Sequence, residues 1–116
     1  IGIVDARILV LGITFKENCP DLRNTRVVEI IEALRDYHAQ VDVHDPWADA
    51  DECRAEYGIE LCQTPAAGSY DAVLIAVGHQ QFSALGAAGI RAWCKPGGVV
   101  YDVKYVLTGE DSDGRL

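Results

Sequence analysis

The sequence has no apolar run near the roughly 18 residues that a membrane-spanning helix needs. It also has few basic residues: 10 Lys and Arg stand against 18 Asp and Glu, so the formal net charge is -8 at pH 7. General nucleic-acid binding needs a basic surface, and docking on anionic membranes needs clustered Lys and Arg. The composition therefore predicts neither a nucleic-acid nor a membrane partner.

Cysteine pairs at metal-binding spacing are missing too. The four cysteines form no C-x-x-C and no paired zinc pattern, and they are too sparse for a disulfide framework. No Ser-His-Asp arrangement stands out either. We therefore expect free thiols in a reducing cytoplasm, no metal site and no catalytic residue in this chain. The cysteines are Cys19, Cys53, Cys62 and Cys94.

The glycine fingerprint of dinucleotide-binding domains is missing from the first predicted strand-to-helix crossing. Only Gly12 lies between Leu11 and Asn24, where a G-x-G-x-x-G motif would place several glycines. A nicotinamide cofactor bound by this chain alone is therefore not expected.

The length of 116 residues, with 49% apolar and 24% charged residues, is typical of one soluble globular domain. No linker interrupts it, so we predict a single domain over residues 1–116. The polar, glycine-containing tail over 109–116 is expected to be disordered. No secretory signal is visible. Because the sequence starts at Ile1 without methionine, we expect an excised domain of a larger protein.

Apolar runs that alternate with amphipathic runs predict an α/β fold. The first and fourth predicted strands are continuously apolar, which is typical of strands covered on both faces. Such alternation predicts a Rossmann-like three-layer sandwich, with a parallel five-stranded sheet in the order 3-2-1-4-5 and helices on both faces. The predicted strands cover residues 6–15, 40–44, 59–61, 72–77 and 99–103. The predicted helices cover residues 27–38 and 47–57, with short helical segments at 79–82 and 90–94.

Individual residues in these segments carry further predictions. Asn24 or Thr25 could cap the first helix, and Gly58 fits the position just after the second. A tight turn is predicted over 95–98, and Gly12 permits close backbone approach or an unusual φ. The predicted buried stripe of the first helix is Val27, Ile30, Ile31 and Leu34.

The crossing from the first strand to the first helix carries clustered positive charge. Lys16, Arg23 and Arg26 lie close together in a chain that is otherwise acidic. Ligands bind at the carboxyl ends of strands in open parallel sheets, and a helix amino terminus favours anions. The loop therefore predicts an anionic, phosphate-bearing ligand.

Each of these cations also has an alternative interpretation. Lys16 could donate to a phosphate, or it could pair with Glu17 or Asp21. Arg23 could clamp a phosphate with two parallel hydrogen bonds, or it could bridge to Asp21. Arg26 could hold an anion, or its side chain could simply be solvated.

Polar residues follow the other predicted strands. Asp45 could bind a ribose hydroxyl, but without the glycine fingerprint a cap for the next helix is favoured. His79 is either a ligand contact or a polar residue at a helix start. Asp102 and Lys104 close the last strand on the same rim, where Lys104 could converge with Lys16.

Several motifs occur in the order found in one enzyme family. Together they resemble the carboxy-terminal, UDP-binding domain of the UDP-glucose/GDP-mannose dehydrogenase family, over about residues 6–107. The stretch from Phe15 to Thr25 most resembles members that oxidise UDP-N-acetylglucosamine or UDP-N-acetylgalactosamine. Those members make uronic acids for surface polysaccharides, including the Vi-antigen type. The matching segments are Gly12–Lys16, Asp21–Thr25, Val43–Pro46, Ala76–Phe82 and Tyr101–Lys104.

The resemblance implies a homo-oligomeric parent enzyme in three parts: an amino-terminal NAD-binding domain, a helical middle domain and this UDP-binding domain. Such enzymes oxidise a sugar C6 alcohol to a carboxylate in two NAD-dependent steps, through a cysteine thioester. By the resemblance, Phe15, Lys16 and Lys104 contact the UDP-sugar substrate, and Arg23 reaches the NAD that the absent amino-terminal domain mainly binds.

The chain departs from the family pattern in two places. None of its cysteines follows Gly-Gly, as the family nucleophile does, so the fragment alone is expected to be inactive. Arg26 stands where many members have proline. The alternative to a dehydrogenase domain is a stand-alone Rossmann-like nucleotide-binding or regulatory module without catalysis.

Overall fold

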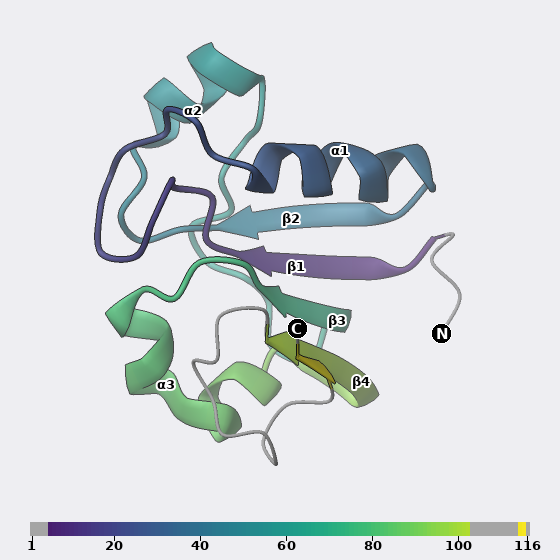
Figure 1. Ribbon diagram of the computed structural model, residues 1–116. Coiled ribbons are helices and arrows are strands. Elements are labelled where there is room, and N and C mark those ends of the chain that lie inside the picture. Colours follow the sequence, from purple (N-terminus) through teal and green to yellow (C-terminus); the bar gives the residue numbers. More distant parts are fainter. Residues whose placement is uncertain (1–4, 103–113, 116) are drawn as a thin grey trace.

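The computed structural model describes residues 5–102 and 114–115. Its first strand is β1 (Arg7–Leu11), an inner strand that is buried on both faces, as its continuous apolar sequence predicts. Ile8 and Val10 pack into the hydrophobic cluster on one face of the sheet, and Leu9 and Leu11 pack into the cluster on the other. The sheet is built outward from this strand (Figure 1).

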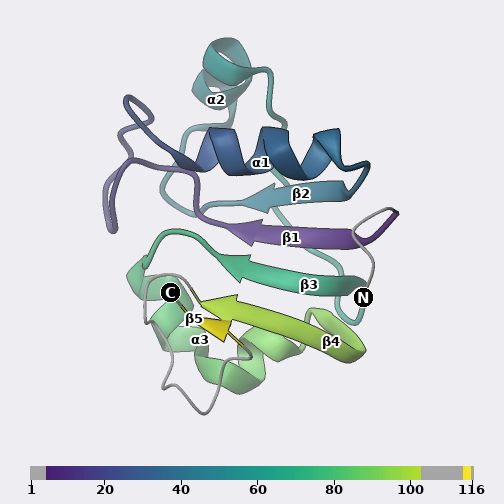
Figure 2. The same cartoon turned by 45° about the vertical axis from the view of Figure 1, so that its right-hand side comes forward.

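The sheet is parallel throughout, as predicted. On either side of β1 lie β2 (Gln40–His44) and β3 (Tyr70–Ile75), followed by β4 (Cys94–Asp102) and the short β5 (Gly114–Arg115). The order is β2-β1-β3-β4-β5. The arrowheads of the strands therefore point the same way, and their carboxyl ends form one rim (Figure 2).

The identity of the fifth strand differs from the prediction. Residues 59–61 form only a single parallel bridge, from Leu61 to Val43, so the predicted edge strand beside β2 is not a strand. The segment is short because Gly58 ends a helix just before it and Pro65 follows soon after. The fifth strand is instead β5, at the opposite edge, within a tail that was expected to be disordered. The rest of that tail, residues 109–113 and 116, lies outside the described residues.

Helices cover both faces of the sheet, as predicted (Figure 1). On one face lie α1 (Val27–Asp36) and α2 (Ala50–Tyr57), whose buried residues join the cluster that contains Ile8. On the other face lies α3 (Gln80–Arg91), which buries Phe82 and Ile90 against Leu9. The two clusters complete the three-layer sandwich.

The buried stripe of α1 is turned from the predicted one. Val27, Val28 and Ile31 are buried, whereas Ile30 is 38% exposed and Leu34 is only partly buried. The sequence pattern allowed either stripe, because adjacent valines and adjacent isoleucines offer two overlapping apolar faces. This rotation of α1 about its axis places Ile30 on the surface beside the loop that follows β1.

The segment between β3 and β4 also differs in detail. One helix, α3, replaces the two predicted helical segments, with a kink at Gly86, where φ is 66°. The strand β4 begins at Cys94, five residues before the predicted start at Val99. The predicted turn over 95–98 survives as an irregularity in the pairing of β4 with β3, and Gly97 has a φ of 82° there.

The end of β1 requires a residue without a side chain. Gly12 has a φ of +95°, and a Cβ added to it would lie 2.5 Å from Cβ of Val77. Its N–H donates to the carbonyl of His44 at 2.8 Å, which continues the pairing with β2. Both reasons for a glycine, close backbone approach and an unusual φ, therefore apply at this position.

We expect Gly12→Ala to lower the free energy of unfolding by roughly 3 kcal/mol, because it adds both φ strain and a steric clash in the core. Urea unfolding followed by circular dichroism would measure this. Gly68→Ala is the matched control: Gly68 also has a positive φ, +65°, but nothing lies within 4 Å of its added Cβ. Equal losses in the two variants would contradict the steric part of the argument.

Candidate functional site

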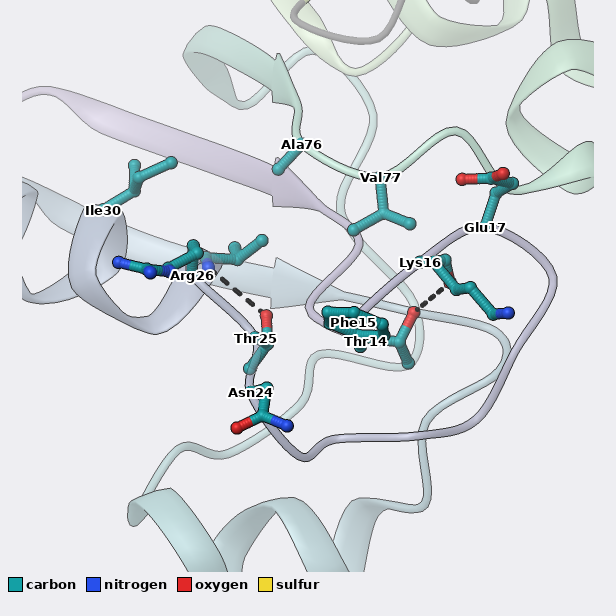
Figure 3. Close-up of a pocket in the computed structure, with 11 residues that line it drawn as sticks. Thr14, Phe15, Lys16, Glu17, Asn24, Thr25, Arg26, Ile30, Ala76 and Val77 are labelled. Atoms are coloured by element: carbon teal, nitrogen blue, oxygen red, sulfur yellow. Dashed lines mark hydrogen bonds between the residues drawn. The ribbon is translucent and has the colours of Figure 1, made fainter.

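A pocket of about 320 Å³ opens at the carboxyl ends of β1 and β3, beside the start of α1 (Figure 3). Residues 14–17 from the end of β1, residues 24–27 and Ile30 from the start of α1, and residues 76–77 after β3 line it. Ligands of open parallel sheets bind at this rim. The long loop from Phe15 to Arg26, called the crossover loop below, therefore forms much of the wall of a ligand-sized pocket.

Two exposed apolar side chains flank this pocket. Phe15 is 53% exposed and Ile30 is 38% exposed, and both line the pocket. An exposed aromatic face can pack against a planar or apolar part of a ligand. Of these two, sequence reasoning selected Phe15 but placed Ile30 in the core.

Lys16 is available to an anion. It is exposed and lines the pocket, and within the described part of the chain its ammonium forms no hydrogen bond or ion pair. The alternative interpretation, pairing with Glu17 or Asp21, is therefore not what the structure shows. In Figure 3 the Lys16 and Arg26 side chains lie on opposite sides of Phe15 and point away from each other.

Arg23 lies on the crossover loop but does not line the pocket. Its side chain is 85% exposed, and its guanidinium holds Asp21 with two bonds: Nε lies 3.0 Å from Oδ1 and Nη2 lies 3.2 Å from Oδ2. The hydrogen bonds from Arg23 lower the pKa of Asp21. The bridge to Asp21 is thus formed, and because it is exposed, its contribution to stability is small and a stronger anion could replace it.

Arg26 forms one long and exposed ion pair, with Glu29, within the described part of the chain. Its side chain is 86% exposed and lies 3.8 Å from Glu29, at the N-cap of α1, where a cation is unfavourable to the helix dipole. The hydroxyl of Thr25 accepts from the N–H of Val27 at 3.2 Å, so Thr25 satisfies one of the free donors at the start of this helix. Thr25 was one of two predicted caps.

Lys104, predicted to contact the substrate, lies outside the described residues, so its convergence with Lys16 stays a prediction. Asp102, at the end of β4, is buried.

Asp45 is buried beneath the crossover loop and is not presented to a ligand. Its side chain is 0% exposed, so it has no surface for a ribose hydroxyl. The prediction that it acts as a cap is closer, because one carboxylate oxygen holds the turn before α2. The carboxylate accepts from Nε2 of His79 at 3.0 Å and from the N–H groups of Ile13 (2.7 Å), Thr14 (3.2 Å), Trp47 (2.7 Å) and Ala48 (3.1 Å).

The charge state of Asp45 follows from these contacts. Burial raises the pKa of its carboxyl group, but the hydrogen bonds from His79 and from the Ile13 N–H lower it by more. The pKa of Asp45 is therefore held below its ordinary value, and the group is a carboxylate at neutral pH.

His79 is fully buried at the start of α3. Its Nδ1 accepts from the N–H of Asn18 at 2.9 Å, and its Nε2 lies 3.0 Å from Oδ2 of Asp45 and 3.2 Å from Oγ1 of Thr14. Because Nδ1 accepts, the hydrogen-bond pattern assigns the proton to Nε2 of a neutral ring. Of the two predicted roles, the polar residue at a helix start is the one observed.

Asn18 is the residue that sequence reasoning missed. It has a φ of 55°, its N–H donates to His79, and its Oδ1 accepts from the N–H of Gln80 at 2.8 Å. Asparagine tolerates this left-handed conformation better than most residues. Its partners lie more than 60 positions away in the sequence, so no local pattern could have indicated the contact.

Among the described residues, the end of β1 lacks the glycine-rich crossing of a dinucleotide-binding domain. A dinucleotide needs closely approaching backbone at its pyrophosphate, and the end of β1 offers one glycine followed by a long loop. In the same described residues, no group of three or more His, Cys, Asp or Glu side chains could hold a metal ion. No helix there is long and apolar enough to cross a membrane.

A parallel α/β sandwich with an open pocket at its strand ends defines a Rossmann-like ligand-binding domain. Residues 9–109 match the sequence profile described as the UDP-glucose/GDP-mannose dehydrogenase family, UDP binding domain. The chain therefore belongs to this family.

Individual relatives agree with this assignment. The chain is 49% identical over 116 residues to the UDP-N-acetyl-D-glucosamine 6-dehydrogenase of Salmonella typhi, covering all of this chain and 27% of that protein. It is 51% identical over 111 residues to the protein of the same name from Pseudomonas aeruginosa, covering 96% of this chain and 26% of that protein. The chain thus spans about a quarter of the length of these relatives.

A solved structure shows the same fold. A UDP-glucose dehydrogenase from the hyperthermophilic archaeon Pyrobaculum islandicum superposes with a TM-score of 0.76 at 30% sequence identity. The match covers 98% of this chain and 25% of that one.

We expect Asp45→Asn to lower the free energy of unfolding by roughly 3 kcal/mol at neutral pH, because an amide cannot accept from all of these donors. Because the folded-state pKa of Asp45 is lowered, its contribution is present above the unfolded-state pKa of about 3.9 and is lost as the pH falls through the folded value. The difference between wild type and variant should therefore shrink below about pH 4.

Urea unfolding between about pH 7 and about pH 2.5 would measure this difference. Asp49→Asn is the matched control, since Asp49 caps α2 through the N–H of Glu52 and asparagine caps helices equally well. A difference that stays constant down to the lowest pH would show that the charge of Asp45 plays no part.

Proposed function

We propose that this chain is the nucleotide-sugar-binding domain of an NAD-dependent UDP-sugar 6-dehydrogenase. The single observation that carries the proposal is the pocket at the strand ends. On one held loop it presents an exposed phenylalanine and a lysine that has no ion pair among the described residues. Membership of a family described by UDP binding supports the nature of the ligand.

The proposed substrate is a UDP-N-acetylhexosamine, oxidised at C6 to the uronate for surface polysaccharide biosynthesis in the cytoplasm. Identities of 49% and 51% to two proteins named UDP-N-acetyl-D-glucosamine 6-dehydrogenase support this class of sugar.

The chemistry of the pocket suits a nucleotide diphosphate. Its pyrophosphate is anionic, and it would meet the ammonium of Lys16 and the amino terminus of α1, which both favour negative charge. The ring of Phe15 offers a flat apolar face to the base or the sugar. Lys104 is proposed to add a further cation from the end of the last strand.

Oxidation itself is assigned to parts of a longer protein. NAD, when bound, accepts hydride, and Arg23 is proposed to reach it from the crossover loop. The thiol of Cys53 is unsuited to be a nucleophile, because it is buried and burial raises its pKa. We therefore propose a positioning role for this domain, at a cleft shared with an NAD-binding domain and a middle domain in a homo-oligomeric parent.

We expect UDP to bind the chain weakly and Lys16→Ala to reduce the affinity about tenfold, because a charge-assisted contact to phosphate is lost. Isothermal titration calorimetry with UDP measures this. Lys95→Ala is the matched control: Lys95 is also exposed, but it pairs with Asp71 at the far end of the sheet. No heat with wild type at millimolar UDP, or equal losses in both variants, would contradict the proposal.

We expect Arg23→Ala to leave UDP affinity unchanged, because Arg23 does not line the pocket. In the full-length protein the same change should raise KM for NAD severalfold, by removing one charged contact. Steady-state kinetics with a saturating UDP-sugar would measure KM. An unchanged KM for NAD would remove Arg23 from the cofactor site.

A further inference from the structure

We propose that His79 is a positioning residue for the crossover loop, acting through Asn18 to hold Phe15 and Lys16 at the pocket. The identity of the ligand at this loop rests on the proposed function. The role of His79 in holding the loop is independent of that function. The inference joins contacts from three strand ends and one helix start.

The His79 ring is fixed on all sides. It is fully buried, and the rings of Trp47 and Phe82 lie 6.2 Å and 5.6 Å from it, centroid to centroid. Nε2 is held by Asp45, whose carboxylate is itself held by the backbone at the end of β1 and after β2. The remaining nitrogen, Nδ1, therefore holds its lone pair at a fixed position that faces the loop.

Asn18 bonds both to this lone pair and to the first N–H of α3. Its N–H donates to Nδ1 of His79, while its Oδ1 accepts from the N–H of Gln80. His79 occupies the N-cap position of α3 but makes no side-chain cap, so the loop residue supplies the cap from a distance of 62 positions. Two hydrogen bonds thus join the tip of the loop to the start of α3.

The base of the loop is also held by bonds that do not pass through the His79 ring, although Nε2 of His79 lies 3.2 Å from Oγ1 of Thr14. The N–H of Phe15 donates to the carbonyl of Asp21 at 2.8 Å, and the hydroxyl of Thr14 donates to the carbonyl of Lys16 at 3.0 Å. Leu22 is buried in the core, and the hydroxyl of Tyr57 donates to its carbonyl. Removal of the His79 ring should therefore free the tip of the loop while its base stays in place.

His79 acts without touching the ligand. Both ring nitrogens already have protein partners, and the side chain has no exposed surface. Its influence on binding therefore passes through the backbone of the loop. A positioning role of this kind predicts local loosening at Asn18, which a general loss of stability does not.

The test replaces His79 by Phe, which keeps an aromatic ring between Trp47 and Phe82. The change removes the polar contacts of the His79 ring with Asn18, Asp45 and Thr14. We expect amide hydrogen exchange at Asn18 to quicken about tenfold or more relative to the core amide of Val10. UDP affinity should fall about tenfold, which corresponds to 1.4 kcal/mol. His79→Gln, whose amide can both accept and donate, should restore part of each effect.

The matched control is Tyr70→Phe. It removes a hydrogen bond from the buried Tyr70 to Asp42, at the opposite end of the sheet. We expect it to lower the melting temperature without changing the relative exchange at Asn18 or the UDP affinity. Relative exchange at Asn18 that quickens equally in this control would overturn the inference.

A second variant covers the case in which His79→Phe does not fold. Asn18→Gly keeps the left-handed backbone and the N–H but loses the bond to Gln80, so it should quicken exchange at the loop tip by a smaller factor. Nitrogen-15 spectra of the wild-type imidazole should show a proton on Nε2 and none on Nδ1. The opposite tautomer, or exchange at Asn18 that neither variant changes, would overturn the positioning role. A wild type that binds no UDP would overturn the proposed function, while the exchange data would still decide the role of His79.

Discussion

The structure at the rim depends on one buried carboxylate. Asp45 follows β2 directly, and its oxygens accept from donors at the end of β1, after β2 and at the start of α3. The parallel register makes this possible. Leu11 pairs with both His44 and Ile75, so the loops that follow β1, β2 and β3 start side by side. Without the carboxylate, several buried donors would have no partner, and each such loss costs about 1–3 kcal/mol. The loop that forms the pocket wall is therefore stabilised by Asp45, whose side chain has no exposed surface.

This arrangement separates the electrostatics of the fold from those of the pocket. A buried negative charge close to an anion site would oppose the ligand, but the donors around Asp45 offset it. The positive charge of Lys16 and Arg26 is carried by exposed side chains above it, in a chain whose formal net charge is -8. Under the proposed function, the basic side chains at this rim would favour the approach of an anionic ligand in a chain that is acidic overall.

Sequence reasoning succeeded where the signal is local. The apolar run of β1 predicted a strand buried on both faces, Gly12 predicted close approach, and Gly58 predicted a helix end in the left-handed conformation, which it has, with a φ of 66°. It failed where distant contacts decide. The exposure of Ile30 depends on which of two apolar stripes meets the sheet, and the role of Asn18 depends on residues brought near by the sheet order.

The loop combines a fixed backbone with free side chains, and this sets how tightly the chain alone can bind. Because the backbone from Phe15 to Asp21 is already held, binding need not order it, which lowers the entropic cost of association. Lys16, however, must still lose side-chain freedom, at up to about 2 kcal/mol, to hold one phosphate. Phe15 and Ile30 expose apolar surface, and a ligand that contacts only one side of the pocket would bury only part of it. If a partner domain lies against this rim, as proposed, it would cover these side chains and add burial without further ordering of the loop, so the affinity would rise.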